Sequence, residues 1–292
     1  VKETKMPMRK IWLGAACLAA AGGLLRSEYE KRHFVTEEFQ ILSEKIRRER
    51  TFVFLSDLHN QEFGPGNRKL LKAVEAAGPD FVLIGGDMMV TKDTCETGPA
   101  LHLTRELAAR YPVYYGNGNH ETRMRDKPEV YGDHYGRYME AVRKAGVVCL
   151  SDSTAVDGDL AITGIDLPKK YYKKFRPARL TDQAVEKLAG PADRERFQIL
   201  LAHSPLFFDA YSRWGADLTL AGHFHGGTIR LPILGGVMTP QYQFFLPCCG
   251  GEFERDGRKM IVSRGLGTHS IPIRFNNKPQ LVVVHLKKKP TF

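Results

Sequence analysis

Five short apolar runs, each followed at once by a turn that carries Asp, Asn or His, constrain this chain more than any other feature. The runs span residues 51–55, 81–84, 113–115, 197–201 and 218–221. Their length and their glycine- or histidine-containing ends are typical of buried strands. Helix-forming stretches lie between them, at 67–77 and at 100–110. Strands that alternate with helices predict an α/β fold built on layered sheets.

The polar residues that follow these runs are the candidate ligands of a metal site. In α/β folds, ligands bind at the carboxyl ends of the strands, and every turn in question lies at such an end. The candidates are Asp57, His59, Asp87, Asn119, His203, His223 and His225. Carboxylates mixed with imidazoles and an amide suit two divalent ions, and they favour Mn, Fe or Zn over Ca or Mg. We expect Mn²⁺ first, with Fe or Zn as alternatives.

The N-terminal region has the layout of a targeting segment. Lys2, Lys5, Arg9 and Lys10 precede an uncharged apolar run at 11–25. A basic segment followed by such a run is typical of a signal peptide or a short signal anchor. As a helix the run would reach about 22 Å, short of the roughly 30 Å hydrocarbon core of a bilayer. A buried or amphipathic N-terminal helix is the alternative.

The rest of the chain shows no linker that would separate a further domain. We predict a signal peptide or signal anchor at 1–25, a connecting segment at 26–50 and one α/β domain at 51–292. Within the connecting segment, the alternating stretch 34–42 predicts an edge strand. The five cysteines include no CxxC pair, so we expect no disulfide framework.

The excess of basic residues indicates anionic partners. Lys and Arg number 43 against 33 Asp and Glu, a net charge of +10. Such a charge favours phosphorylated substrates or anionic lipid headgroups, and no nucleic-acid-binding module is visible. The basic aromatic stretch 169–179 either contacts a membrane or headgroup or is a solvated loop.

Five sequence blocks, taken in order, carry a family resemblance. They are DLH at 57–59, GGD at 85–87, GNGNHE at 116–121, AHSP at 202–205 and GHFHGG at 222–227. They resemble the DxH, GD, GNH[DE], H and GHxH signature of the calcineurin-like metallophosphoesterase family. The resemblance implies a layered α/β/β/α sandwich that hydrolyses phosphoesters with two divalent ions.

The resemblance also implies roles for single residues. Asp57, His59 and His225 would hold the first ion, Asn119, His203 and His223 the second, and Asp87 would bridge them. A metal-activated hydroxide would attack phosphorus. His120 would be the catalytic residue that protonates the leaving group or steadies the phosphoryl oxygens. Glu121 would either orient His120 or be a solvated turn residue.

The flanking sequence looks like that of a membrane-associated bacterial branch of the family. That branch includes wall-associated phosphoesterases and a UDP-diacylglucosamine pyrophosphatase. The likeness rests on the apolar N-terminal run, the block GHFHGGTIRLP and the segments 263–267 and 271–275. Arg264 and Arg274 in the last two segments either bind substrate phosphate or make ordinary surface and ion-pair contacts.

Together these features predict a hydrolase of a phosphodiester, phosphomonoester or pyrophosphate bond at the bacterial cell membrane. The substrate would be lipid-linked or a nucleotide-sugar, with UDP-2,3-diacylglucosamine as one candidate. We favour an outer-face catalytic domain, whereas a UDP substrate would require the cytoplasmic face. The alternative of another class is a non-enzymatic cell-wall- or membrane-binding protein on the same fold.

Overall fold

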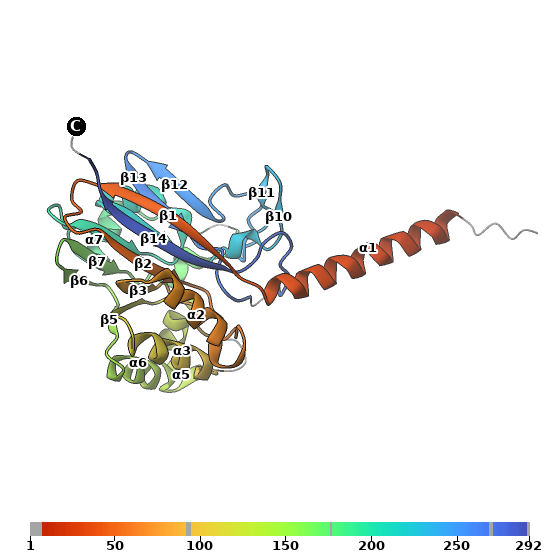
Figure 1. The fold of residues 1–292 in the computed structure, drawn as a ribbon, viewed down its shortest axis with the longest axis horizontal. Coiled ribbons are helices and arrows are strands. Elements are labelled where there is room, and N and C mark those ends of the chain that lie inside the picture. Colours follow the sequence, from red (N-terminus) through yellow and green to blue (C-terminus); the bar gives the residue numbers. More distant parts are fainter. Residues whose placement is uncertain (1–7, 92–94, 176, 269–270, 291–292) are drawn as a thin grey trace, which may run out of the picture.

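The computed structural model describes residues 8–91, 95–175, 177–268 and 271–290, and it places two six-stranded sheets against each other (Figure 1). The first sheet has the order β1 (Val35–Ser43), β14 (Gln280–Lys288), β2 (Arg50–Leu55), β3 (Phe81–Ile84), β4 (Val113–Gly116), β5 (Val148–Leu150). The second has the order β12 (Gly251–Arg255), β13 (Arg258–Val262), β9 (Leu218–Ala221), β8 (Phe197–Leu201), β7 (Leu160–Gly164), β6 (Ser153–Asp157). A separate small hairpin joins β10 (Arg230–Leu231) to β11 (Gly235–Gly236).

Successive side chains along each strand point to opposite faces of the sheet, and this explains the layered arrangement. In β2, Phe52 and Phe54 pack into the core between the two sheets, whereas Val53 and Leu55 pack on the opposite face. Because successive side chains of a strand point to opposite faces, a fully apolar strand must be covered on both sides. Helices supply the outer cover, so the chain forms the predicted α/β/β/α sandwich.

The helices divide between the two outer faces. Those on the first sheet include α2 (Arg68–Ala77), α3 (Gly98–Ala108) and α6 (His134–Lys144), and those on the second are α7 (Asp182–Ala189) and α8 (Phe208–Trp214). The shorter elements are α4 (Asn119–Asp126), α5 (Pro128–Tyr131) and the 3₁₀ turns Pro65–Asn67, Lys169–Tyr172, Pro205–Phe207 and His225–Gly227. All five cysteines are free in the structure.

The predicted edge strand at 34–42 is confirmed as β1. It pairs with β14 alone, in parallel, with Val35 opposite Gln280. This strand lies in the predicted connecting segment 26–50, which therefore contributes to the first sheet.

Helix α1 (Met8–Lys31) extends away from the sandwich (Figure 1). Its apolar side chains from Trp12 to Leu25 are exposed, as for Trp12 at 69% and Leu18 at 77%. Its last turns are fixed, because the backbone N–H groups of Arg274 and Asn277 donate to the side chains of Ser27 and Glu30. Among the residues the structure describes, no helix is long and apolar enough to cross a membrane. Residues 1–7 of the predicted targeting segment lie outside the described part, and the anchor stays a prediction.

Candidate metal centre

The carboxyl ends of five strands bring all seven predicted ligands together. β2, β3 and β4 are parallel neighbours in the first sheet, and β8 and β9 are parallel neighbours in the second. Each ligand lies in the turn that follows one of these strands, and each is buried: Asp57, His59, Asp87, Asn119, His203, His223 and His225. The two sheets therefore assemble one site from segments that are distant in sequence.

The first group of ligand atoms comes from Asp57, His59 and His225. The Nε2 atoms of the two histidines lie 3.2 Å apart, and Nε2 of His225 lies 3.4 Å from Oδ1 of Asp57. One oxygen or nitrogen of each residue lies within 4.8 Å of the other two. This is the group expected to hold the first ion.

The second group surrounds Asp87. Its Oδ2 lies 3.1 Å from Nε2 of His203, and His223 completes a second set of ligand atoms within 4.8 Å. One side-chain amide atom of Asn119 lies 2.8 Å from Nδ1 of His223 and 3.3 Å from Oδ2 of Asp87. Oδ2 of Asp87 also lies 4.0 Å from Nε2 of His59, in the first group. Asp87 thus lies between the groups, where a bridging carboxylate is needed.

Two histidines present the nitrogen that a metal requires. Nδ1 of His203 lies 2.8 Å from the carbonyl oxygen of Gly85, and Nδ1 of His225 lies 3.1 Å from that of Gly267. A carbonyl only accepts, so each Nδ1 carries a hydrogen and donates it. Each Nε2 is therefore left without a hydrogen when the ring is neutral and points into the cluster. Backbone carbonyl groups commonly orient metal-binding histidines in this way.

The charges of the metal-free cluster favour a cation. Burial raises the pKa of Asp57 to about 6, although His203 opposes the rise. Burial acts on Asp87 in the same direction, but His203 and His120 hold its pKa well below the usual range. Burial lowers the pKa of His203, and the carboxylates of Asp87 and Asp57 outweigh it and raise that pKa to about 10. The two carboxylates that raise this pKa would likewise stabilise the positive charge of a divalent ion bound at Nε2 of His203.

The ligand turns adopt unusual backbone conformations. Five of the seven have positive φ, a region that non-glycine residues seldom occupy: Asp57, His59, Asp87, His223 and His225. The β3 and β4 turns also touch backbone to backbone. A Cβ added to Gly86, whose φ is +83°, would lie 2.0 Å from the backbone nitrogen of Gly118. Such strain persists only where the surrounding structure imposes it, and it commonly marks functional sites.

Comparison with known proteins agrees with this geometry. The sequence profile described as Calcineurin-like phosphoesterase matches residues 50–227. The chain belongs to the calcineurin-like phosphoesterase family. It is similar to the uncharacterized metallophosphoesterase YkuE of Bacillus subtilis, with 27% identity over 94% of this chain and 93% of that protein. The phosphodiesterase YaeI of Escherichia coli is 26% identical over 80% of this chain and 81% of its own length.

An uncharacterized metallophosphoesterase of Aquifex aeolicus is 28% identical over 90% of this chain and 95% of its own length. Calcineurin-like phosphoesterases use two metal ions, and the two residue groups fit that requirement in donor type and burial. Bound there, divalent ions would lower the pKa of a water molecule and neutralise charge on the phosphoryl group.

His120 lies at the edge of the cluster in a fixed tautomer. The backbone N–H of Thr91 donates to Nδ1 of His120 over 2.8 Å. That nitrogen must accept, so a neutral His120 carries its proton on Nε2. Nε2 lies 4.0 Å from Oδ2 of Asp87, on the side of the ligands. The imidazole can therefore offer a proton to a group bound beside Asp87.

Glu121 has neither of the roles expected from the sequence. It is fully buried, so it is not a solvated turn residue. Its carboxylate accepts from the backbone N–H groups of Asp87, Met88 and Gly118, at 2.8, 3.0 and 3.0 Å. It thus locks the β3 turn to the β4 turn and positions Asp87, while Thr91 orients His120.

Arg264 and Arg274 make internal contacts. Arg264 forms an ion pair with Glu37 on β1, at 2.6 Å. Arg274 is buried and donates to the carbonyl oxygens of four residues: Arg264, Gly265, Gly267 and Asn277. These contacts favour the ion-pair and structural alternative for both, and substrate binding by either stays a prediction.

Tyr172 and Thr91 are site residues that sequence reasoning missed. The ring of Tyr172 packs 5.0 Å from that of His223, and it comes from the stretch 169–179, for which the sequence predicts either contact with a membrane or headgroup or a solvated loop. Neither residue lies in a signature block. Only the aromatic content of 169–179 gave a signal, and nothing in the sequence marked Thr91.

Proposed function

We propose that the chain hydrolyses a phosphodiester or pyrophosphate bond of an anionic, lipid-linked substrate at a membrane surface. The observation that carries the hydrolytic part is the position of Asp87, which lies between two groups of buried ligand atoms with His120 alongside. Metal-assisted attack by water needs this arrangement, whereas a binding protein does not.

The residues have separable tasks in this proposal. Asp57 and Asp87 supply the negative charge that would draw in two cations, Asn119 and the four ligand histidines would supply neutral donor atoms, and the bound cations would attract the phosphoryl group. His120, with its proton on Nε2, supplies that proton to the leaving oxygen or hydrogen-bonds a phosphoryl oxygen. Tyr172 covers one side of His223 and limits the access of bulk water there.

The membrane part of the proposal is supported by helix α1. Its exposed apolar residues have no covering partner among the described residues, and its last turns are joined to the 271–277 segment next to the ligands. An exposed apolar helix beside an active site favours a substrate that resides in lipid. Manganese is the ion we expect, with iron or zinc as alternatives.

The test is turnover of a generic aryl phosphodiester by the full-length chain in detergent, with and without Mn²⁺. We expect metal-dependent turnover that Asp87→Asn abolishes. Asp256→Asn is the matched control, because Asp256 is an exposed turn residue between β12 and β13 with positive φ. If both variants behave like the parent, or no metal supports turnover, the non-enzymatic cell-wall- or membrane-binding alternative is preferred.

A headgroup panel tests the substrate. UDP-2,3-diacylglucosamine, a lipid phosphodiester and a lipid phosphomonoester are compared at equal concentration in mixed micelles. Preference for the first by a large factor in kcat/KM would identify a pyrophosphatase of lipid-linked nucleotide-sugars. A phosphatase or fluorescent-protein fusion at Phe292 reports the side of the membrane. An outer-face signal together with that preference would contradict the pyrophosphatase assignment, because UDP substrates are cytoplasmic.

A further inference from the structure

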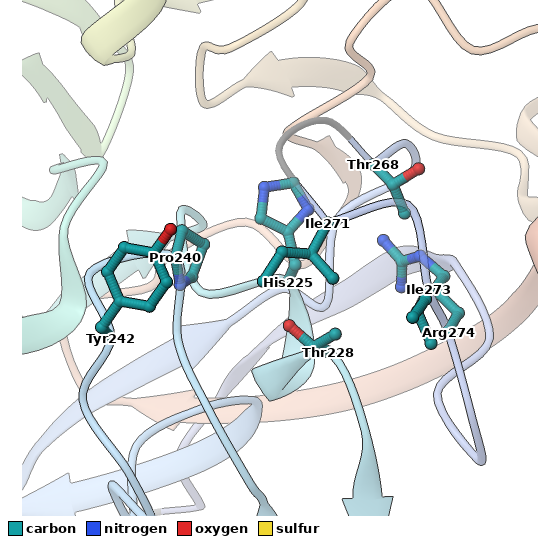
Figure 2. Close-up of a pocket in the computed structure, with 8 residues that line it drawn as sticks. All are labelled: His225, Thr228, Pro240, Tyr242, Thr268, Ile271, Ile273 and Arg274. Atoms are coloured by element: carbon teal, nitrogen blue, oxygen red, sulfur yellow. The ribbon is translucent and has the colours of Figure 1, made fainter.

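Two pockets of different character adjoin the ligand cluster. One, of about 30 Å³, lies beside His225 of the first ligand group, and its lining combines four apolar residues with two threonines and the buried Arg274 (Figure 2). The other is lined by Asn119 of the second group and carries basic side chains. A substrate that reaches both pockets must pass across the ligands.

The apolar pocket is built by two segments on the side of α1. Figure 2 shows Pro240 and Tyr242 on one side of His225 and Ile271 on the other. The segment that holds Ile271 and Ile273 continues to Arg274, whose backbone N–H donates to Ser27 of α1. The apolar pocket is thus joined directly to the base of the exposed apolar helix.

Further exposed apolar residues lie on the segment that carries Pro240 and Tyr242. Within 229–245, Ile233 is 106% exposed, Leu234 62%, Phe244 60% and Phe245 54%. Exposed apolar residues gathered in one segment mark surfaces that contact lipid or another apolar ligand. Phe244 and Phe245 follow the pocket residue Tyr242 by two and three positions, so apolar surface continues along the chain from the pocket.

The basic pocket has a volume of about 130 Å³ and lies beyond Asn119. Arg123, Lys127 and Lys169 line it, and the single acidic lining residue, Asp126, is paired with Arg125 at 2.9 Å. Its charge therefore suits an anion. Arg123 also donates to the carbonyl oxygen of Thr91, so it belongs to the support of His120.

One segment lines the basic pocket and contacts a residue of the other pocket. Lys169 and Tyr172 line the basic pocket. Three residues later, Phe175 stacks on Tyr242 of the apolar pocket, with ring centroids 5.8 Å apart. The basic aromatic stretch 169–175 thus runs from one pocket to the other beside the ligand histidines.

We propose that the substrate is an amphiphile that lies across the ligand cluster. The start of its apolar group enters the Tyr242–Ile271 pocket and the rest lies over the exposed apolar residues of 233–245, while a second anionic group occupies the Lys127–Lys169 pocket. This inference rests on the proposed function and deepens it. The reacting phosphoryl group lies between the two parts, next to Asp87 and His120. Lys127, Lys169 and Ile271 are then specificity-determining residues, each for a different part of the substrate.

The experiment measures binding of three phosphonate monoesters to the Mn²⁺-supplied full-length chain by calorimetry. The 2-sulfoethyl ester of decylphosphonate has both a tail and a second anion. The methyl ester of decylphosphonate has only the tail, and the 2-sulfoethyl ester of methylphosphonate has only the anion. All three share one central phosphonate.

We expect the double variant Lys127→Gln/Lys169→Gln to weaken the binding of both sulfoethyl probes by roughly fivefold and to change the affinity for the tail-only probe by less than about twofold. Ile271→Asn should weaken the binding of both decyl probes by roughly fivefold or more, and its affinity for the anion-only probe should stay within about twofold of the parent's. Lys187→Gln on α7 and Val156→Asn on β6 are the matched exposed controls, and neither should alter any probe.

Uniform weakening of all three probes, or no change in any, overturns the inference. Turnover of the aryl phosphodiester is measured on the same preparations. If the aryl phosphodiester is turned over but the variants do not affect the probes selectively, the chain is a hydrolase and the two-pocket substrate is rejected. If the variants affect the probes selectively but there is no turnover, the amphiphile-binding site stands and the hydrolase function is rejected.

Discussion

The backbone N–H of Thr91 lies 2.8 Å from Nδ1 of His120, and this contact determines which nitrogen of the imidazole holds the proton. The Thr91 hydroxyl lies 3.0 Å from the same atom. Because the backbone donor alone fixes Nδ1 as the acceptor, the hydroxyl adds support and does not set the tautomer.

Two variants separate these contributions. His120→Asn should lower kcat for an aryl phosphodiester by about 100-fold or more, since it removes the proton donor. Thr91→Val keeps the backbone N–H and should lower kcat by less than about tenfold, the value of one hydrogen bond. Steady-state kinetics with metal content measured in parallel tests this. Equal losses in the two variants, at unchanged metal content, would contradict the merely supporting role of the Thr91 hydroxyl.

The close approach of Gly86 and Gly118 predicts a large difference between two glycine substitutions. Gly86→Ala combines positive φ with a Cβ only 2.0 Å from a backbone nitrogen, and it should cost more than about 4 kcal/mol of unfolding free energy. Gly257→Ala also has positive φ, at +71°, but has nothing within 4 Å of the new Cβ. It should cost only about 1–2 kcal/mol of conformational strain. Denaturant unfolding compares the two, and similar losses would show that the two turns do not pack as described.

Glu121 should matter for stability through the three backbone N–H groups that donate to its carboxylate. Glu121→Gln places an amide NH₂ against backbone N–H donors, so we expect a loss of about 1–3 kcal/mol of unfolding free energy. Glu140→Gln is the control, because that side chain is 62% exposed and should change stability by less than about 0.5 kcal/mol. A Glu121→Gln protein as stable as its control would exclude the locking role.

Metal binding should release a proton from His203. With a pKa of about 10 in the metal-free protein, its imidazole is protonated at pH 7 and must lose that proton before Nε2 can bind a cation. The apparent metal affinity should therefore rise as the pH rises toward that pKa and fall as the pH is lowered. Calorimetry in buffers of different ionisation enthalpy counts the protons released. An affinity independent of pH between 6 and 8, with no proton release, would be inconsistent with this account.

The ligands could be predicted from the sequence because each one follows its own strand. Asp57 and His203 are 146 positions apart, but the apolar run before each identified it as a strand end. Parallel strands converge at their carboxyl ends whatever their order in the chain. The strand β1 was likewise marked by its own alternation.

The supporting contacts could not be predicted, because they join residues with no local pattern. Thr91 reaches His120 from a loop, and Glu30 of α1 reaches Asn277 across most of the chain. Residue type also does not tell whether an arginine side chain faces solvent or is buried. Arg274 is of the right type to bind phosphate, and the sequence gives no sign that its guanidinium donates to carbonyl groups of the surrounding loop.

The central claim, that Asp87 bridges two cation sites, is tested most directly by metal stoichiometry. Elemental analysis of the full-length chain after Mn²⁺ loading and removal of free metal should give two ions per chain. Asp87→Asn should retain less than one ion, and Asp256→Asn should retain two. One ion or none in the parent, or two in Asp87→Asn, would contradict the two-metal site.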